Sequence, residues 1–238
     1  MKVDILAFGA HPDDVELSAA ATLLKHIQQG KKVALVDLTE GELGSRGTIE
    51  TRYEEAKAAS KILGIEDRVN LKMGDGFFEH SQENLMKIVE QIRHFKPEIV
   101  LANAVEDRHP DHGKASKLVS DACFLAGLVK IKTNLKGEDQ LPHRPKMVFH
   151  YIQDRYIKPD FVVDVTGFEE QKFESIRAYK TQFFDPNSPE PQTPISGKDF
   201  FEFLRGRMSE FGRSIGVQYA EGFTVERIAG VDSFFDLK

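Results

Sequence analysis

The feature that most constrains the fold of this chain is the regular alternation of short apolar runs with amphipathic segments over its first 130 residues. Apolar runs rich in strand-forming residues lie at 2–8, 33–39, around Leu71 and at 98–102. Segments with apolar residues at helical spacing separate and follow them, at 14–29, 51–63, 83–95 and 113–130. This alternation predicts an α/β fold, in which a mostly parallel sheet with right-handed crossovers carries helices on both faces.

Local signals support these boundaries. Gly30 closes the first predicted helix, and Pro97 follows the third. Thr51 and Glu54 have the spacing of a capping box, which places the start of the second helix at Thr51.

The last 100 residues are less regular. Strands are predicted at 146–151 and 161–165, and helices at 168–182 and 198–212. Between these helices, the proline-rich loop 183–197 carries four prolines within nine residues, which forbid a helix or an inner strand. Its role as a lid, a subunit contact or a surface connection stays open. The length fits one large domain, so 1–238 is predicted to be a single domain.

Composition argues against several classes of protein. The net charge is −6, whereas nucleic-acid binding would favour a basic stripe. No window approaches the roughly 18 apolar residues of a membrane span, and the apolar start carries Asp4 and reads as a strand, not as a signal peptide. Cys123 is the only cysteine, so it makes no internal disulfide and is predicted to be a small buried apolar residue. We therefore expect a cytoplasmic protein that binds neither nucleic acid nor membrane.

Two His-Pro-Asp segments each follow a predicted strand. The first, 9–14, comes directly after the strand at 2–8, and the second, 103–112, comes after the strand at 98–102. In an open parallel sheet with strand order 3-2-1-4, these two strands flank the crevice in which ligands bind. The topology is therefore expected to bring together two segments that are about 100 residues apart.

Residue types in the first segment suit a catalytic zinc site. Histidine and carboxylate are favoured zinc ligands, and three protein ligands leave one position open for water. Residues three apart at a helix start lie on one side, so His11 and Asp14 are expected to share the metal while Asp13 points elsewhere. Zinc lowers the pKa of its water, and a free carboxylate beside it, such as Asp13, is a natural general base.

The second segment allows two ligand sets, because His109 and His112 are also three residues apart. If both bind, the site has four ligands and is closed, which makes it structural. If only His112 binds, His109 is left to act as an acid or to stabilise an oxyanion, and Asp111 could orient a histidine. Spacing alone does not choose between the two sets.

At these residues the chain resembles the LmbE-like (PIG-L) family of zinc deacetylases. The resemblance covers roughly 3–130 and rests on three matches in the family's order: 10–14 (Ala-His-Pro-Asp-Asp), 39–44 (Thr-Glu-Gly-Glu-Leu-Gly) with Arg52 and 54–56 downstream, and 109–112 (His-Pro-Asp-His). It implies a Rossmann-like fold and hydrolysis of the N-acetyl group of a glucosamine conjugate, which is a small molecule. It also implies that His11, Asp14 and His112 hold one zinc ion per subunit.

The resemblance further implies roles for residues around the metal. Asp13 would be the general base, and His109, with Asp111 behind it, would stabilise charge or protonate the leaving amine. Arg52 would contact the substrate. These roles correspond to the open, catalytic form of the site.

Within the family the chain is most similar to the deacetylases of bacillithiol biosynthesis, which convert N-acetylglucosaminyl malate to glucosaminyl malate and acetate. The supporting features are the length and the segments 107–113 and 213–223. Malate carries two carboxylates, which arginine forks bind well. Arg52 and Arg108 are predicted to bind the substrate, and Arg46 is also near the proposed crevice. The similarity further implies a homo-oligomer, with a hexamer as the expected assembly.

Other functions stay open from the sequence. A deacetylase of an inositol or chitobiose-type conjugate would need fewer arginines. A phosphoesterase would use two metal ions and more bridging carboxylates. A non-catalytic protein with a structural zinc would recruit His109 as a fourth ligand. The ligand types also leave the metal open between zinc and iron(II).

Overall fold

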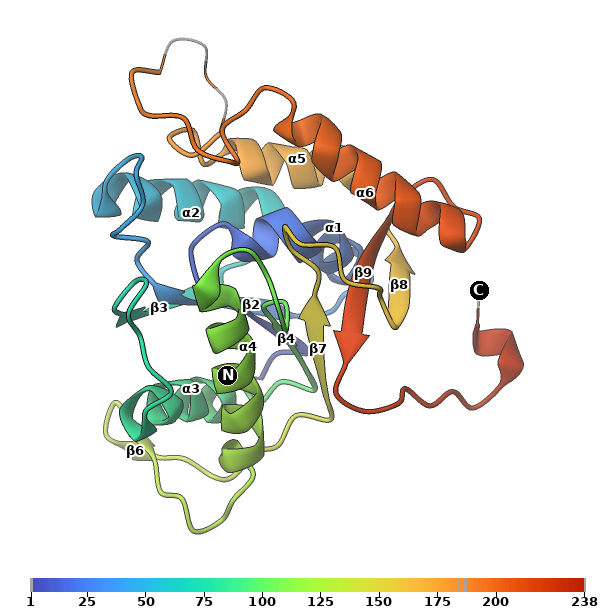
Figure 1. Cartoon of the computed structure of the whole chain (residues 1–238). Coiled ribbons are helices and arrows are strands. Elements are labelled where there is room, and N and C mark those ends of the chain that lie inside the picture. Colours follow the sequence, from blue (N-terminus) through green and yellow to red (C-terminus); the bar gives the residue numbers. More distant parts are fainter. Residues whose placement is uncertain (1, 184, 186–187, 238) are drawn as a thin grey trace.

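A seven-stranded sheet runs through the molecule (Figure 1). The computed structural model describes residues 2–183, 185 and 188–237. The strand order is β3 (Asp67–Met73), β2 (Val33–Thr39), β1 (Ile5–Gly9), β4 (Ile99–Ala102), β7 (Met147–Tyr151), β9 (Ala220–Val225) and β8 (Phe161–Asp164). The first five strands pair in parallel, and β9 pairs antiparallel with β7 and β8. The predicted α/β fold with a mostly parallel sheet is confirmed, and β1 and β4 are neighbours as predicted.

Helices cover both faces of the sheet (Figure 1). One face carries α1 (Asp14–Gln28), α2 (Ile49–Leu63) and α5 (Glu169–Arg177), and the other carries α3 (Gln82–Phe95) and α4 (Pro110–Ala126). The remaining described elements are α6 (Phe200–Ser214), which packs on β9, the strands β5 (Asn134–Leu135) and β6 (Glu138–Asp139), and the 3-10 helix η1 (Phe234–Asp236). Of the helices described, none combines the length and the apolar character needed to span a bilayer.

The side chains of β1 alternate between the two layers of helices. Leu6 and Phe8 pack with apolar residues of α3 and α4, whereas Ile5 and Ala7 pack with α1. All four are buried, which explains why a strand with two covered faces reads as an uninterrupted apolar run. Burying one large apolar side chain contributes roughly 1.5–3 kcal/mol, so these contacts fix β1 in the centre of the sheet.

The start of α2 differs from the prediction because another residue caps the helix. The backbone N–H of Thr51 donates to Oγ1 of Thr48 at 3.3 Å, and the N–H of Thr48 donates to Oγ1 of Thr51 at 2.7 Å. The capping box therefore joins Thr48 to Thr51 and not Thr51 to Glu54, and the helix begins at Ile49.

Two further helices are shorter or displaced relative to the prediction. The helix predicted at 113–130 runs from Pro110 to Ala126, because proline is well accommodated in the first turn of a helix. The helix predicted at 168–182 ends at Arg177.

Strand β9 was not identified from the hydrophobic pattern, because Glu221 and Gly222 interrupt it. Glu221 is nevertheless buried, and its Oε1 lies 2.6 Å from Nζ of Lys172 in α5. Its carboxylate also accepts hydrogen bonds from the backbone N–H groups of Ala21 and Thr22 in α1. A buried charge with these partners occupies a position that a hydrophobic pattern assigns to solvent.

The proline-rich loop packs against the loop that follows β2. Arg46 donates from Nη2 to Oγ of Ser188 at 3.0 Å, and the N–H of Gly47 donates to Oε1 of Glu190 at 3.2 Å. Residues 184 and 186–187 of this loop lie outside the described part of the chain.

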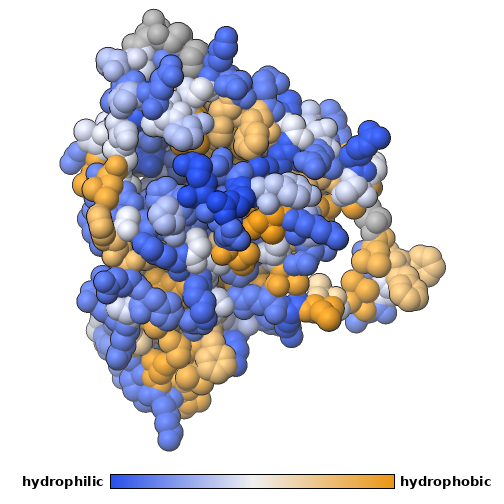
Figure 2. Space-filling model, viewed as in Figure 1, coloured by the Kyte–Doolittle hydropathy of each residue, from blue (hydrophilic) through white to orange (hydrophobic). Residues whose placement is uncertain are grey.

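Beyond β9 the chain ends in an exposed segment, the C-terminal arm (residues 228–237), which extends away from the body (Figure 1). Ile228, Phe234 and Phe235 are 94%, 89% and 97% exposed. Figure 2 shows apolar surface gathered on the part of the molecule that projects at the right of the view.

Candidate metal centre

The topology brings the two His-Pro-Asp segments together at the carboxyl ends of β1 and β4, which pair in parallel. A hydrogen bond of 2.9 Å from the backbone N–H of Ala10 to Oδ1 of Asn103 joins the two loops. Gly9 permits a tight turn after β1, since a Cβ at this position would lie 2.9 Å from the carbonyl oxygen of His11. The predicted convergence of the two segments is confirmed.

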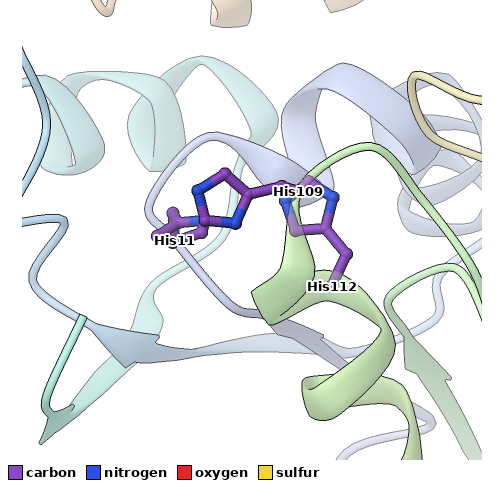
Figure 3. A group of neighbouring side chains, drawn as sticks. All are labelled: His11, His109 and His112. Carbon is purple, nitrogen blue, oxygen red and sulfur yellow. The ribbon is translucent and has the colours of Figure 1, made fainter. Parts of the chain in front are cut away.

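Three histidines form a compact cluster (Figure 3). His11 comes from the loop after β1, and His109 and His112 come from the start of α4. The ring centroid of His11 lies 4.6 Å from that of His109 and 5.6 Å from that of His112, and the latter two are 5.2 Å apart. One nitrogen of each ring lies within 4.8 Å of the others, so the cluster is small enough to surround a metal ion.

Asp14, the first residue of α1, lies between two of these histidines. Its Oδ2 is 3.6 Å from Nδ1 of His11, and its Oδ1 is 3.1 Å from Nε2 of His112. Asn103 and Gln153 each donate a hydrogen bond of 3.0 Å from their side-chain amides to this carboxylate, which fixes its position. Two imidazoles and one carboxylate are the ligands of a three-ligand zinc site.

In His11 and His112, the outer nitrogen, which is the one that faces away from Asp14, contacts a carboxylate. Nε2 of His11 lies 2.9 Å from Oδ1 of Asp75, and Nδ1 of His112 lies 2.5 Å from Oδ2 of Asp107. A carboxylate in this position orients a metal-binding imidazole and sets which nitrogen faces the metal. The other nitrogens of both rings face Asp14, the arrangement that the predicted ligand set needs, although the three histidines are a set whose ligand atoms all lie within 4.8 Å of one another.

A second group of metal-ligand residue types lies on the outer side of His11. Ligand atoms of His11, Asp75 and Asp111 lie within 4.8 Å of one another. Oδ2 of Asp75 accepts a hydrogen bond from the N–H of Leu43, and Oδ2 of Asp111 accepts one from the N–H of Gly76. Both carboxylates are therefore held by backbone groups and act on His11 from outside the centre.

The carboxylates make the centre favourable for positive charge. Burial alone would lower the pKa of His11, but hydrogen bonds with carboxylates, Asp111 first, raise it well above the usual range. Burial likewise opposes the charged form of His112, yet the charge of Asp14 and the hydrogen bond with Asp107 raise its pKa to about 9. Burial disfavours ionisation of Asp14, and the charge of His112 nevertheless holds its pKa well below the ordinary value. A field that stabilises two imidazolium ions also favours a metal cation, which would replace their protons.

Asp13 differs from Asp14 in conformation and surroundings. Its φ is 120°, a region that residues with a side chain rarely adopt. Its Oδ2 lies 2.9 Å from Nη1 of Arg52, so the carboxylate is held in a buried ion pair, whereas the sequence predicted a free group. Burial raises the pKa of Asp13 to about 6, with Arg52 opposing the rise. A carboxylate that titrates near neutrality beside a metal centre has the properties of a general base.

His109 caps α4 and is held in one tautomer. Its Nδ1 accepts a hydrogen bond of 3.3 Å from the backbone N–H of Asp111, which assigns the ring proton to Nε2. Burial and the charges of His11 and His112 lower its pKa. The resemblance implied that Asp111 stands behind His109, but its Oδ2 lies 3.6 Å from Nε2 of His11.

The three arginines predicted near the crevice have different surroundings. Arg52 and Arg108 line the cavity beside the centre. Arg108 is half-exposed, and its Nε lies 2.8 Å from Oδ2 of Asp154. Arg46 is buried, lies outside the described lining of this cavity, and donates to Ser188 in the proline-rich loop.

In the segment 39–44, which resembles the family, the structure shows why position 41 is a glycine. Its φ is +69°, and a Cβ there would lie 3.1 Å from Nη2 of Arg52. Glycine therefore allows the loop to lie directly against the guanidinium that holds Asp13.

A cavity of about 360 Å³ opens beside the centre. Its walls include His11, Asp13, Asp14 and His112 on one side and residues of α6 on another. This volume falls within the range of small-molecule sites.

Four residues of the centre were not predicted from the sequence: Asp75, Asn103, Asp107 and Gln153. The first three follow strands β3 and β4 at their carboxyl ends, a position that could have indicated them. Gln153 follows β7, which joins the parallel part of the sheet, and its own sequence context carries no signal.

Comparisons with known proteins identify the family of the chain. A family model described as PIG-L, GlcNAc-PI de-N-acetylase, matches residues 6–123. The diacetylchitobiose deacetylase of Thermococcus kodakarensis is 30% identical over 232 residues, which cover 92% of this chain and 81% of that protein. The crystal structure of the conserved protein TT1542 from Thermus thermophilus matches with a TM-score of 0.84 and 35% identity, over 97% of this chain and 98% of that one. The N,N'-diacetylchitobiose deacetylase from Pyrococcus horikoshii has the same fold, with a TM-score of 0.78 and 23% identity over 93% of this chain and 83% of that one.

The family model spans both His-Pro-Asp segments, and the Thermococcus relative matches nearly the whole chain. The chain therefore belongs to the PIG-L family of de-N-acetylases, and it is a deacetylase, a hydrolase that removes the acetyl group of an N-acetylated amine.

Proposed function

We propose that this deacetylase is zinc-dependent and hydrolyses N-acetylglucosaminyl malate to glucosaminyl malate and acetate, a step of bacillithiol biosynthesis. The observation that carries the metal chemistry is the position of Asp14, whose carboxylate oxygens lie 3.6 Å from Nδ1 of His11 and 3.1 Å from Nε2 of His112. These ligands would hold one zinc ion per subunit and leave a position open. Since iron(II) also accepts this ligand set, metal analysis of the purified protein decides the metal.

The chain's own residues supply the proton transfers. A bound zinc ion supplies a Lewis acid that polarises the acetyl carbonyl and lowers the pKa of water. Asp13 accepts a proton from the attacking water as the new C–O bond forms, and with a pKa of about 6 it is ionised at neutral pH. The Nε2–H of His109 donates a hydrogen bond to the oxyanion of the tetrahedral intermediate. Asp13 then delivers its proton to the amine nitrogen as the C–N bond breaks, which releases acetate and the free amine.

Arginines at the cavity support malate as the substituent of the sugar. Arg108 stands at the cavity wall, oriented by Asp154, and Arg52 lies beside Asp13. Malate carries two carboxylates, which a guanidinium binds through paired hydrogen bonds. We assign substrate contacts to Arg52 and Arg108, as the family resemblance implied for Arg52.

A chitobiose-type substrate is the second candidate. It is favoured by the diacetylchitobiose deacetylase that is 30% identical to this chain. An uncharged sugar in the same cavity would make no use of the charge of Arg108, and an inositol conjugate shares this property. A non-catalytic zinc site would require His109 as a fourth ligand through Nε2, the nitrogen that keeps the ring proton while Nδ1 accepts the N–H of Asp111.

Mass spectrometry of the zinc-loaded protein with three substrates separates these candidates. N-acetylglucosaminyl malate, the corresponding inositol conjugate and diacetylchitobiose are compared at equal concentration, with His112→Ala as the inactive control. Faster loss of acetate from the malate compound supports the proposal. Faster deacetylation of either neutral compound excludes malate as the preferred substituent but retains the mechanism. No hydrolysis of any of the three contradicts the proposed substrate class.

The remaining features of the proposal concern the whole protein. We infer a single catalytic domain over 1–238, a cytoplasmic location and a homo-oligomer, with a hexamer as the expected assembly. The apolar C-terminal arm supports self-association, because side chains as exposed as Phe234 and Phe235 favour a protein partner.

A further inference from the structure

The cavity extends from the metal centre under α6, which lies over β9 (Figure 1). Six residues of α6 line it, and they recur every three or four positions, which places them on one face of the helix. These residues are Phe200, Phe203, Leu204, Arg207, Met208 and Phe211. Five are apolar, so Arg207 is the single charged side chain that this helix face presents to the cavity.

Arg207 is held by a backbone group and not by a charge. Its Nη2 donates a hydrogen bond of 2.6 Å to the carbonyl oxygen of Asp154, and its guanidinium lies 4.6 Å from the centre of the Phe203 ring. The carboxylate of Asp154 is engaged by Arg108. Among residues 2–183, 185 and 188–237, no carboxylate oxygen lies within 4.0 Å of the Arg207 guanidinium.

Among the described residues, the buried Arg46 and Arg93 donate to uncharged oxygens, as Arg207 does, whereas Arg52, Arg68 and Arg205 have carboxylate partners. Arg52 pairs with Asp13, and Arg205, two residues before Arg207, pairs with Glu170 at 2.7 Å. Burial lowers the pKa of Arg207, with nearby carboxylates opposing this only from longer range. Arg93 donates four hydrogen bonds, whereas the partly buried Arg207 donates the one to Asp154, so its guanidinium keeps donors that an anionic ligand would satisfy.

We propose that Arg207 binds a carboxylate of the substrate, on the part of the molecule that lies beyond the N-acetylated sugar. The guanidinium offers a planar fork that fits a carboxylate, while the apolar residues of α6 contact the carbon chain that carries it. This inference rests on the proposed deacetylase function and adds a second anchoring point to Arg108. It makes Arg207 a specificity residue, which selects acidic conjugates without touching the reacting amide.

Kinetics with a matched pair of substrates tests the assignment. N-acetylglucosaminyl malate is compared with its dimethyl ester, which has the same skeleton without the charges. Arg207→Gln retains a donor for the Asp154 carbonyl and removes the charge, and Arg205→Gln is the control on another face of the helix. We expect Arg207→Gln to raise KM for the malate compound about 10- to 100-fold, as for loss of a charged hydrogen bond, with kcat within about twofold. KM for the ester should stay unchanged, and Arg205→Gln should affect neither substrate.

Thermal unfolding and Arg207→Lys separate binding from a structural role. Arg207→Lys keeps the charge but not the fork, so its KM for the malate compound should fall between those of the wild type and Arg207→Gln. A uniform loss of activity on both substrates, with a lowered unfolding temperature, overturns the proposal. Equal KM values of the wild type for both compounds overturn it as well.

Inhibition by free malate distinguishes failure of this inference from failure of the proposed substrate. Malate is added during hydrolysis of diacetylchitobiose, whether or not the malate conjugate is itself a substrate. Competitive inhibition that weakens at least about tenfold in Arg207→Gln supports the carboxylate site even if another conjugate is the substrate. Inhibition that is unchanged in Arg207→Gln, or absent in the wild type, contradicts it.

Discussion

Asp13 combines a strained backbone with a buried charge at the metal centre. Its φ of 120° places the side chain where a Cβ is unfavourable, and the ion pair with Arg52 holds it there. Strain of this kind persists at functional sites when neighbouring contacts compensate for it. The same conformation gives the two adjacent carboxylates different partners, Arg52 for Asp13 and His112 for Asp14.

The strain at Asp13 can be measured with two substitutions that both remove the carboxylate. Asp13→Gly relieves the unfavourable φ and Asp13→Ala does not, so Asp13→Gly should be more stable by about 1–3 kcal/mol in urea unfolding. At Glu54, which is exposed in helix α2, the order should reverse, because alanine is favoured over glycine in a helix. Equal stabilities of the two Asp13 variants would show that the backbone there is not strained.

The roles of Asp13 and His112 predict opposite outcomes for metal content and turnover. Asp13→Asn should retain the metal and lose about 10²- to 10⁴-fold in kcat, because only the general base is removed. His112→Ala should lose the metal itself. Metal content by mass spectrometry, measured beside turnover, checks both. Loss of metal in Asp13→Asn, or retention in His112→Ala, would contradict the assignment of ligand and base.

Most of the centre could be predicted from residue types and spacing, because its residues follow two neighbouring strands. Asp75 and Asp107 also follow strands, but which histidine each of them contacts could not be predicted. Asp75 reaches His11 from the loop after β3, and its contribution depends on distances that no local pattern records. The same holds for Gln153, which reaches Asp14 from beyond β7.

At the scale of elements, one partly buried arginine joins three parts of the fold. Arg68 of β3 donates to both oxygens of Asp37 in β2, at 2.7 and 2.8 Å, and to Oε1 of Glu16 in α1 at 2.7 Å. Tyr179 donates to the same oxygen of Glu16 at 2.9 Å. Because β3 is an edge strand, this network ties it to the core of the sheet.

Removing this arginine should destabilise the fold strongly. Arg68→Met leaves two buried carboxylates without their cation, which costs about 3–5 kcal/mol. Lys117→Met, which breaks an exposed pair with Asp121, should cost less than about 1 kcal/mol. Urea unfolding of the two variants gives the comparison, and similar losses would show that the buried pair is no more important than the exposed one.

The loss of stability in Arg68→Met should depend on pH because Asp37 titrates. Burial raises the pKa of Asp37 above its ordinary value of 3.8, and Arg68 opposes that rise. In the Arg68→Met variant the pKa of Asp37 in the folded state rises further. The variant therefore keeps the contribution of Asp37 to its stability below pH 3.8 and loses it as the pH increases through this folded-state pKa. The difference from the wild type should therefore be larger at pH 7 than at pH 5.

Elements were predictable where hydrophobic periodicity reflects burial and were missed where charge replaces it. The strand β1 is apolar on both faces, and its pattern is unambiguous. The strand β9 contains Glu221, which is buried because Lys172 of another element neutralises it. Since that partner lies 49 residues away in sequence, local periodicity does not reveal the strand.

At the scale of the whole molecule, removal of the C-terminal arm should affect the assembly of subunits and leave the stability of the folded chain nearly unchanged. All of residues 228–237 except Ser233 are exposed, so ending the chain after Arg227 should change the unfolding temperature by less than about 2 °C. Light scattering should show a smaller assembly for this shortened chain and for Phe234→Ser/Phe235→Ser. Leu141→Ser, at an exposed site elsewhere on the body, is the control that should leave the assembly intact. An unchanged assembly in the shortened chain would exclude the arm as an interface.

Placement of the cavity walls along the chain has a consequence for how such enzymes diversify. Every residue proposed to hold the metal or move a proton lies between His11 and His112, within the stretch that the family model matches. The α6 wall of the cavity, Phe200–Ser214, lies outside that stretch. Mutations in this helix can therefore alter which conjugate is accepted and leave the residues proposed for hydrolysis unchanged. A chimera that carries α6 of a relative should acquire the substrate preference of the donor and keep the reaction of the recipient.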